Sequence, residues 1–264
     1  MKKEKILINI DNLDEIKEYK KIGINNFLFA VSYFSIGYKT FEIDELYDLD
    51  CNKFILINRI LNSNDVDKLK DMKDDFLLFD GIIFEDISVY NIFKDSNINL
   101  IWNQIHFATN YSSINYWNNI VSNVVISNEL TNDEINGILE KSNKNLILNV
   151  FGKNPVMYSR RTLLSNFNKN FNLSDNKNVL LKETITNNEF EASECEFGTF
   201  VKNNTYFNLI PYLNELNNDK INFYLIYPDG LKFNEIIEYI NGKISGTNDG
   251  FRNKKIIYKL GDRK

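Results

Sequence analysis

The feature that most constrains the fold is a regular alternation of short apolar runs with amphipathic segments. The runs ILINI, FILIN, GIIF, NVVIS and LILNVF are almost continuously apolar, as expected of strands buried on both faces of a parallel sheet. Strands that alternate with helices predict β/α units. We expect strands at 5–10, 26–32, 54–60, 81–84, 99–107, 123–127, 145–151 and 222–227, and helices at 13–22, 63–72, 89–93, 111–120, 133–142, 209–216 and 234–240.

The length of the chain favours closure of these units into a ring. The chain has 264 residues, close to the roughly 250 that are typical of one (β/α)8 barrel. An open, doubly wound sheet fits the same alternation, but no glycine-rich phosphate-binding turn follows an early strand. The sequence therefore predicts an α/β protein with a (β/α)8 TIM-type barrel, in one domain from residue 1 to residue 264.

The regular alternation of strand-like and helix-like segments is interrupted after residue 166. Between 166 and 206 the sequence is β-rich and irregular, with candidate strands at 179–182, 184–186 and 198–201. We expect a small antiparallel insertion there, before the last strand–helix unit of the barrel. The segment 242–264 is turn-rich and basic, which is typical of a solvated end; its cations are Arg252, Lys254, Lys255, Arg263 and Lys264.

Composition argues against several classes of protein. A hydrophobic content of 43% supports a sizeable core, and a formal net charge of −5 argues against general electrostatic binding of nucleic acid. No apolar run approaches the roughly 18 residues of a membrane span, and the N-terminus does not resemble a signal peptide. We therefore expect a soluble, cytoplasmic protein without a membrane partner.

The residues available also limit metal chemistry. The chain has one histidine, His106, and two cysteines, Cys51 and Cys195. A closed zinc site normally uses four Cys or His ligands and an iron–sulfur cluster usually uses four Cys, so neither can be built within this chain. We predict no cofactor and no transition-metal site, although carboxylates could hold a divalent cation.

One stretch, NVFGKNPVMYSRRTLLS at 149–165, combines a strand end with polar and cationic groups. The apolar run breaks at a glycine, and Tyr158, Ser159, Arg160 and Arg161 follow it. Barrel enzymes commonly build their sites from such groups at strand ends. The alternative is an ordinary strand, turn and helix whose arginines pair with local carboxylates.

The same stretch resembles the U32 family of peptidases, whose signature after a strand is close to (H/F)-G-x-x-(P/C)-x-x-Y-S-x-R-C-x-x-S. Thr162 stands where the family has a cysteine. The residues that fit are Phe151, Gly152, Pro155, Tyr158, Ser159, Arg161, Leu163 and Ser165. Earlier stretches resemble family motifs in the same order; they are Asn58 at the end of the third strand, DGII at 80–83 followed by Asp86, Asn110, and VISNEL at 125–130.

The resemblance implies a barrel fold and, by the family's name, peptidase activity. In well-understood members four cysteines hold a 4Fe–4S cluster, and those proteins support hydroxylation of RNA bases or of a quinone precursor. These cysteines are absent here, Asn128 replaces an arginine before Glu129, and Gln104 lies one residue too far from Asn110 to match the family's glutamine. Phe151 in place of a histidine resembles the small subunit of a two-protein branch, which implies a heterodimer with another U32 protein.

Side chains at the carboxyl ends of barrel strands meet at one mouth of the barrel. The candidates for catalysis there are Glu129 and Ser159. Glu85 and Glu129 could form a general acid–base pair or bind a divalent cation. Alternatively, Asp86 caps the next helix and Glu129 pairs with a nearby arginine. The expected ligand-binding set is Asn58, Glu85, Asp86, Gln104, Asn110, Ser127, Tyr158, Arg160 and Arg161.

Two of these roles need partners that the sequence does not place. Ser159 as a nucleophile would need an adjacent base, and His106 is the only imidazole in the chain. His106 could instead be a hydrogen-bonded residue of the core. Adjacent guanidiniums bind carboxylate or phosphate bidentately, so Arg160 and Arg161 indicate a small anionic or peptide ligand.

Two functions of different classes stay open. The leading hypothesis is a U32-like peptidase, a hydrolase without an iron–sulfur cluster; the alternative is a non-catalytic partner subunit of a cluster-bearing U32 relative in RNA or quinone-precursor hydroxylation. A polar pocket that joins Glu129 and Arg161 around an ion or small anion would favour the enzyme. An exposed apolar face near the mouth would favour the partner subunit. RNA binding is a third and weaker hypothesis, given the acidic net charge.

Overall fold

The computed structural model describes residues 1–104, 106–143 and 145–254. Within them, parallel strands form a closed barrel in which β14 pairs with both β8 and β1. In their order around the barrel the strands are β1 (Ile6–Asn9), β2 (Asn26–Val31), β4 (Asn52–Ile57), β5 (Gly81–Phe84), β6 (Asn99–Trp102), β7 (Asn123–Ile126), β8 (Leu146–Gly152) and β14 (Ile221–Ile226). The predicted (β/α)8 TIM-type barrel is confirmed.

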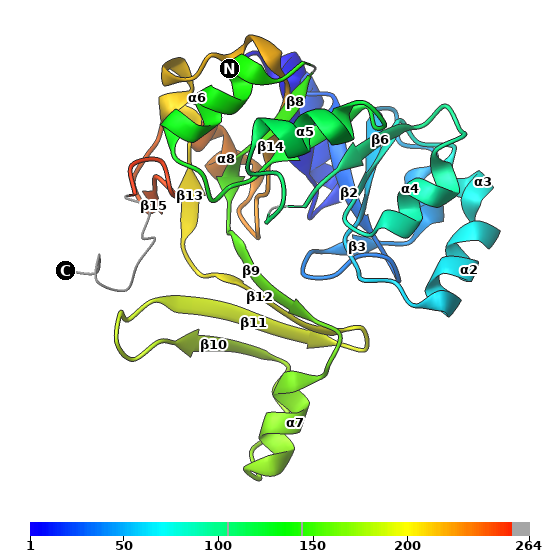
Figure 1. Cartoon of the computed structure of the whole chain (residues 1–264). Coiled ribbons are helices and arrows are strands. Elements are labelled where there is room, and N and C mark those ends of the chain that lie inside the picture. Colours follow the sequence, from blue (N-terminus) through cyan, green and yellow to red (C-terminus); the bar gives the residue numbers. More distant parts are fainter. Residues whose placement is uncertain (105, 144, 255–264) are drawn as a thin grey trace.

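Helices cover the outside of the barrel (Figure 1). After β2 the chain forms a loop with β3 (Thr40–Phe41) and the short 3-10 helix η3 (Ile43–Leu46) in place of an α-helix. Among the helices in the described part of the chain, none combines the length and apolar character needed to span a bilayer. The other helices are η1 (Lys3–Lys5), η2 (Leu13–Glu15), α1 (Ile16–Lys21), α2 (Ser63–Asp71), α3 (Lys73–Phe76), α4 (Ile87–Phe93), α5 (Tyr111–Asn118), α6 (Asn132–Lys141), η4 (Ile210–Glu215), η5 (Asn218–Lys220) and α8 (Phe233–Ile240).

The helices after the strands begin at polar capping residues. Asn62, Asp86, Asn110 and Thr131 each accept a hydrogen bond from a backbone N–H two or three residues further along the chain. Such caps satisfy donors that the first helical turn leaves free. Each cap therefore sets the point at which the chain turns back from a strand end.

Alternation along the strands divides the core into two layers. Side chains on one face of each strand fill the barrel interior, among them Leu56, Ile83, Val125 and Leu225. Side chains on the other face pack under the helices in a larger cluster that includes Ile55 and Ile82. Because successive residues of a strand point to opposite faces, the polar residue two positions after an inward apolar one also points inward. The polar residues at several strand ends thus converge on the barrel mouth.

A four-stranded antiparallel sheet, here called the cap sheet, lies between β8 and β14 in sequence and stands beside the barrel in Figure 1. Its order is β10, β11, β12 and β9. Strands β10 and β12 coincide with strands expected at 179–182 and 198–201, whereas β9 precedes the expected start of the insertion at residue 166. The bounds are β9 (Pro155–Ser159), β10 (Asn178–Lys182), β11 (Glu189–Cys195) and β12 (Gly198–Asn203), with α7 (Leu163–Asn170) after β9; β13 (Tyr206–Asn208) and β15 (Thr247–Asn248) extend the barrel sheet.

One expected strand is absent, and two further elements differ in length or type from the expectation. The segment 184–186 is a turn because the Glu183 carboxylate accepts hydrogen bonds from the backbone N–H groups of Ile185 and Thr186. The strand expected at 99–107 ends at Trp102, so His106 lies in a turn. The helix expected at 209–216 is the 3-10 helix η4.

The basic tail is only partly the solvated end that the sequence predicts. The Arg252 side chain is 15% exposed and forms an ion pair with Glu215, to which its Nε donates at 3.0 Å. Its guanidinium also lies 4.0 Å from the centre of the Tyr212 ring. Lys254 is exposed, and Lys255, Arg263 and Lys264 lie outside the described residues.

Candidate functional site

A cavity of about 690 Å³ opens at the carboxyl ends of the barrel strands. Residues at or just beyond the ends of β4, β5, β6 and β14 form one part of its wall. The cap sheet forms another part through Tyr158 and Phe200. This cavity occupies the mouth at which the sequence predicts a site.

Glu85 lines this cavity and is partly buried. It directly follows β5, and the alternation that points Ile83 into the barrel also points Glu85 inward. Its carboxyl group forms no ion pair with a described residue, and its contact with Asn103 Nδ2 is long, at 3.5 Å from Oε1. Burial raises the pKa of Glu85 to about 8, because no cation offsets the loss of hydration. The carboxyl group is therefore mostly protonated at neutral pH and can donate a proton.

Two tyrosines outside the predicted set line the same cavity. Tyr38 lies in the loop after β2 and Tyr227 directly follows β14; their rings stack with centroids 4.9 Å apart. Within the described residues neither hydroxyl has a hydrogen-bond partner. Burial raises the pKa of both phenols, so both keep their protons at neutral pH.

The loop that carries Tyr38 depends on a glycine. Gly37 has a φ of +83°, and a Cβ atom there would lie 2.3 Å from the Phe200 ring. Glycine is the residue that accepts both the left-handed backbone and the close approach of the ring. Gly37 thus allows Tyr38 to reach Tyr227 beside the cap sheet.

Amide and aromatic side chains complete the lining. The Asn149 side chain is buried in the wall, and its Oδ1 lacks a hydrogen-bond partner within the described residues, as does Oδ1 of Asn128. Trp102 and Trp117 stack with ring centroids 4.4 Å apart. Buried amides without partners are costly unless water or a ligand satisfies them. The lining therefore suits a flat, polar and uncharged ligand.

Arg59 is a buried cation in the wall of the cavity. Its guanidinium lies 3.6 Å from the centre of the Phe197 ring and 4.9 Å from that of Tyr33, and pairs with Asp65 at 3.3 Å. It also donates to the carbonyl oxygen of Tyr33. Burial would raise the pKa of Asp65, but hydrogen bonds from the Asn62 N–H and the Tyr33 hydroxyl, together with the Arg59 charge, hold it below its usual value. Arg59 thus holds the tip of the cap sheet against the barrel with its charge already neutralised.

The predicted ligand-binding residues from the barrel mostly serve structural contacts. The Asn58 amide exchanges two hydrogen bonds with the Ile36 backbone, at 2.9 and 3.0 Å, and so fixes the loop after β2. Asp86 accepts from the Leu61 and Ser88 N–H groups, so the alternative that it caps a helix is correct. Asn110 caps α5, Ser127 is fully buried and accepts from the Glu129 N–H, and Gln104 donates to the Glu85 carbonyl oxygen. Asn58, Glu85, Asp86 and Gln104 all line the cavity.

Glu129 and the arginines do not come together. Glu129 pairs with His106 at 3.5 Å, and both side chains are about half exposed. Ser159, at the end of β9, accepts a hydrogen bond from the Arg161 N–H at 3.2 Å, and no described base contacts it. Arg160 and Arg161 are exposed. None of these residues except His106 lines the cavity in the described part of the chain.

The cysteines do not fit a cluster. Cys51 precedes β4, at the amino end of the barrel strands, whereas Cys195 ends β11 on the cap sheet at the opposite end. Burial raises the pKa of the Cys51 thiol to about 11, which disfavours the thiolate that binds metals. In the described part of the chain, no group of three or more His, Cys, Asp or Glu side chains is placed to hold a metal ion.

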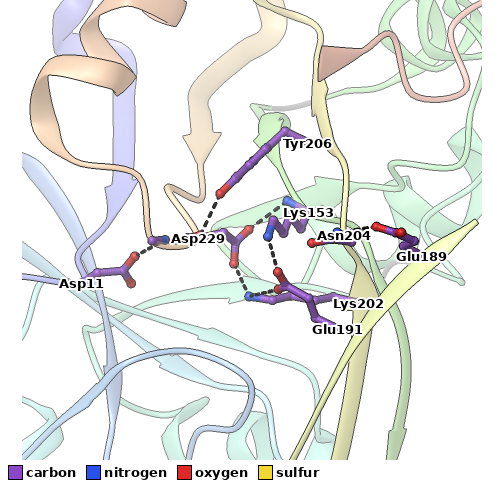
Figure 2. A network of polar contacts seen from close by, with 9 residues as sticks. Asp11, Lys153, Glu189, Glu191, Lys202, Asn204, Tyr206 and Asp229 are labelled. Atoms are coloured by element: carbon purple, nitrogen blue, oxygen red, sulfur yellow. Dashed lines mark hydrogen bonds and ion pairs between the residues drawn. The ribbon is translucent and has the colours of Figure 1, made fainter. Parts of the chain in front are cut away.

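A network of charged groups fastens the cap sheet to the barrel mouth (Figure 2). Lys202 on β12 pairs with Asp229 at 2.6 Å, and Lys153, just after β8, pairs with Glu191 on β11. Asp229 also accepts a hydrogen bond of 2.8 Å from the Lys153 N–H. Burial raises the pKa of Asp229 in spite of Lys202, because its side chain is only 1% exposed. The sequence analysis missed this network, since its members come from four separate segments.

The match to a protein family agrees with this architecture. A family model described as peptidase family U32 matches residues 39–223, which contain the barrel strands β4 to β8 and the whole cap sheet. The chain belongs to peptidase family U32. No curated protein sequence matches this U32 barrel.

Solved structures resemble the U32 barrel only distantly. The spore cortex-lytic enzyme SleL of Bacillus cereus has a TM-score of 0.44 and 9% identity, covering 93% of this chain and 76% of that one. SleL of Bacillus megaterium QM B1551 has a TM-score of 0.41 and 11% identity, with 91% and 74% covered. A chitinase of Chromobacterium violaceum ATCC 12472 has a TM-score of 0.40 and 6% identity, with 89% and 98% covered. At these values the likeness supports no inference about activity.

Proposed function

We propose that this protein is a hydrolase of family U32 that cleaves an amide bond in a small, uncharged peptide-like substrate, with Glu85 as the general acid. The observation that carries the proposal is the Glu85 carboxyl group, which lines a cavity at the carboxyl ends of the barrel strands and pairs with no cation in the described residues; burial raises its pKa to about 8. A general acid works best when its pKa lies near the working pH. The family's description as peptidases supports the choice of an amide substrate.

The proposed reaction consumes one water molecule. The water oxygen bonds to the carbonyl carbon, and the carbon–nitrogen bond then breaks with its electron pair on nitrogen. Glu85 gives its proton to the leaving nitrogen, and the proton lost by the water returns to the Glu85 carboxylate. The products are a carboxylic acid and an amine, and the Glu85 carboxyl group is protonated again at the end of the reaction. Asn149 and the aromatic wall would orient the substrate.

The test is hydrolysis of a defined set of short peptides by the purified full chain, with new amino termini measured by mass spectrometry. We expect Glu85→Gln to lower the rate by about 100-fold or more, the usual contribution of a general acid. The wild-type rate should fall above pH 8, where Glu85 loses its proton. Glu140→Gln, which alters an exposed carboxylate of α6, is the matched control. Full activity in Glu85→Gln, or complete loss in Ser159→Ala instead, would refute the assignment to Glu85.

A non-catalytic partner subunit is the second candidate, and an exposed apolar surface favours it. The exposed apolar side chains lie on α7 and its connections, where the Phe167 and Phe171 rings have centroids 4.7 Å apart, and on the two edge strands of the cap sheet, β9 and β10. They are Val156, Met157, Leu163, Phe167, Phe171, Leu173, Leu180, Leu181 and Ile185. The segment 155–182 also carries five Lys or Arg and one acidic residue, although the whole chain has a net charge of −5. Such a surface is typical of a protein interaction site.

Co-expression with a cluster-bearing U32 protein, followed by size-exclusion chromatography, tests this second candidate. We expect a heterodimer that Phe167→Ser combined with Phe171→Ser disrupts. Leu78→Ser is the control. Leu78 lies between α3 and β5, outside the cap sheet and α7, and is 63% exposed, so this variant should leave the complex intact. Separate elution of the wild-type proteins would count against a partner role.

A further inference from the structure

The hydroxyls of Tyr38 and Tyr227 have no hydrogen-bond partner within the described residues, and both tyrosines line the mouth cavity. We propose that the hydroxyls of Tyr38 and Tyr227 together bind one carbonyl oxygen of the substrate and stabilise the negative charge that it gains in the reaction. This inference rests on the proposed function in one respect, namely that the cavity is the active site. It adds the part of the substrate that the cavity recognises.

The placement of the two hydroxyls follows from the packing of the rings. The rings lie nearly parallel, at 25° with centroids 4.9 Å apart, and both residues line the cavity. Tyr19 has a hydroxyl that is both buried and unpartnered, whereas those of Tyr38 and Tyr227 are unpartnered but accessible. The accessible space next to both residues is the cavity. The ring of Tyr38, from the loop after β2, thus lies against the ring of Tyr227, just after β14, in the wall of a cavity that a ligand can enter.

The two groups act as donors. A phenol can donate or accept a hydrogen bond, but burial raises the pKa of both tyrosines, so neither loses its proton. Donors that are fixed in advance around a developing negative charge stabilise it more in a water-poor site than in water. Glu85 lines the same cavity, but its proton goes to the leaving nitrogen in the proposed reaction, so the two phenols bind the oxygen without it.

The charges around the pair permit an anionic oxygen. The charged groups that face Tyr38 are Lys202, Asp229 and Asp11, besides Glu85. Asp229 is paired with Lys202 at 2.6 Å, and Asp11 accepts a hydrogen bond from the Gly230 N–H at 3.0 Å. The Lys202 ammonium lies 5.7 Å from the centre of the Tyr38 ring. Besides Glu85, the acidic side chain in the described wall of the cavity is Asp86, whose carboxylate accepts hydrogen bonds from the Leu61 and Ser88 N–H groups.

Binding of 4-nitrophenol to the full chain tests the proposal without any hydrolysis. Its absorbance reports whether it is bound as the phenol or as the phenolate, whose oxygen stands in for the charged carbonyl oxygen. At about pH 6 we expect the bound probe to shift toward the phenolate, because the site prefers an anionic oxygen. Tyr38→Phe and Tyr227→Phe should each weaken binding by about tenfold or more, the value of one hydrogen bond to a charged group.

Tyr116→Phe is the matched control. Tyr116 lies on α5, is 65% exposed and does not line the cavity, so affinity for the probe should not change. Above pH 8 the ionised Glu85 should repel the phenolate, and Glu85→Gln should remove this decline. Phenylalanine keeps the ring packing, so loss of binding will not reflect loss of the fold.

The outcomes separate this inference from the proposed function. Equal affinity of wild type and both phenylalanine variants, or binding of the probe as the neutral phenol, would overturn it. Tyrosine-dependent phenolate binding in a protein that cleaves no peptide would support the donor pair and refute the hydrolase. If peptide cleavage requires Glu85 but the affinity for 4-nitrophenol is the same in wild type and in both phenylalanine variants, the donor pair alone is refuted.

Discussion

Replacing Glu85 by glutamine should stabilise the protein in alkaline solution and leave it unchanged in acid. In the folded protein the Glu85 pKa is about 8, against 4.5 for an ordinary glutamic acid. Below pH 4.5 both the folded and the unfolded states are protonated. Between 4.5 and 8 the unfolded state releases a proton that the folded state keeps, so stability falls as the pH rises. Above pH 8 the loss is complete.

The size of the effect follows from the two pKa values. At about 1.4 kcal/mol per pKa unit, the ionised carboxylate costs about 5 kcal/mol of unfolding free energy above pH 8 and about 3 kcal/mol at pH 7. Water that enters the cavity screens the charge, so these are upper figures. Glutamine has nearly the same shape and no charge, and therefore removes this cost.

Urea denaturation of wild type and Glu85→Gln at pH 5 and pH 9 measures the difference. We expect nearly equal free energies of unfolding at the lower pH and a gain of about 2–5 kcal/mol for the variant at the higher pH. Glu140→Gln, on the exposed face of α6, should follow wild type at both pH values. A gap between wild type and Glu85→Gln that stays constant across the pH range would refute the reasoning from burial.

Two further predictions concern the packing around the cavity. Lys202→Met removes the ammonium that pairs with Asp229 at 2.6 Å and leaves a carboxylate with a side chain only 1% exposed; we expect a loss of about 3–5 kcal/mol in guanidinium denaturation, and an unchanged midpoint would contradict a structural role for the pair. Gly37→Ala places a methyl group 2.3 Å from the Phe200 ring at a φ of +83°, and should cost about 1–3 kcal/mol. Gly137→Ala in the middle of α6 meets no atom within 4 Å and should instead add about 0.5–1 kcal/mol; effects of the same sign at both glycines would contradict the steric argument.

The barrel was predictable from the sequence because its signals are local. A strand buried on both faces must be apolar throughout, and a helix start needs a polar cap within a few residues. The run GIIF and the cap Asp86 lie side by side in the chain, and each was assigned correctly. Glu85 was also in the predicted set, because it directly follows a strand whose carboxyl end had to face the mouth.

The cap sheet and the rest of the site depended on contacts between distant segments. Tyr38 meets Tyr227 only because the barrel closes through β14, and Phe200 reaches Gly37 only across the cap sheet. The sequence placed Arg160 and Arg161 at a barrel strand end, but β9 leaves the barrel to pair with β12, and both arginines become exposed. Strand pairing depends on contacts between segments that are far apart in the sequence, so a local pattern does not predict it.

By itself the sequence determined the alternation of parallel strands with helices and one acid that directly follows a strand; closure of the barrel and strand β11 of the cap sheet came from the structure. Periodicity of apolar residues and polar caps act over a few residues, and a single chain displays them directly. Only the tertiary structure decided that this acid is protonated, since its pKa depends on how much protein surrounds it and on the absence of a paired cation within the described residues. The same packing decided which tyrosines, of the 14 in the chain, stand beside it.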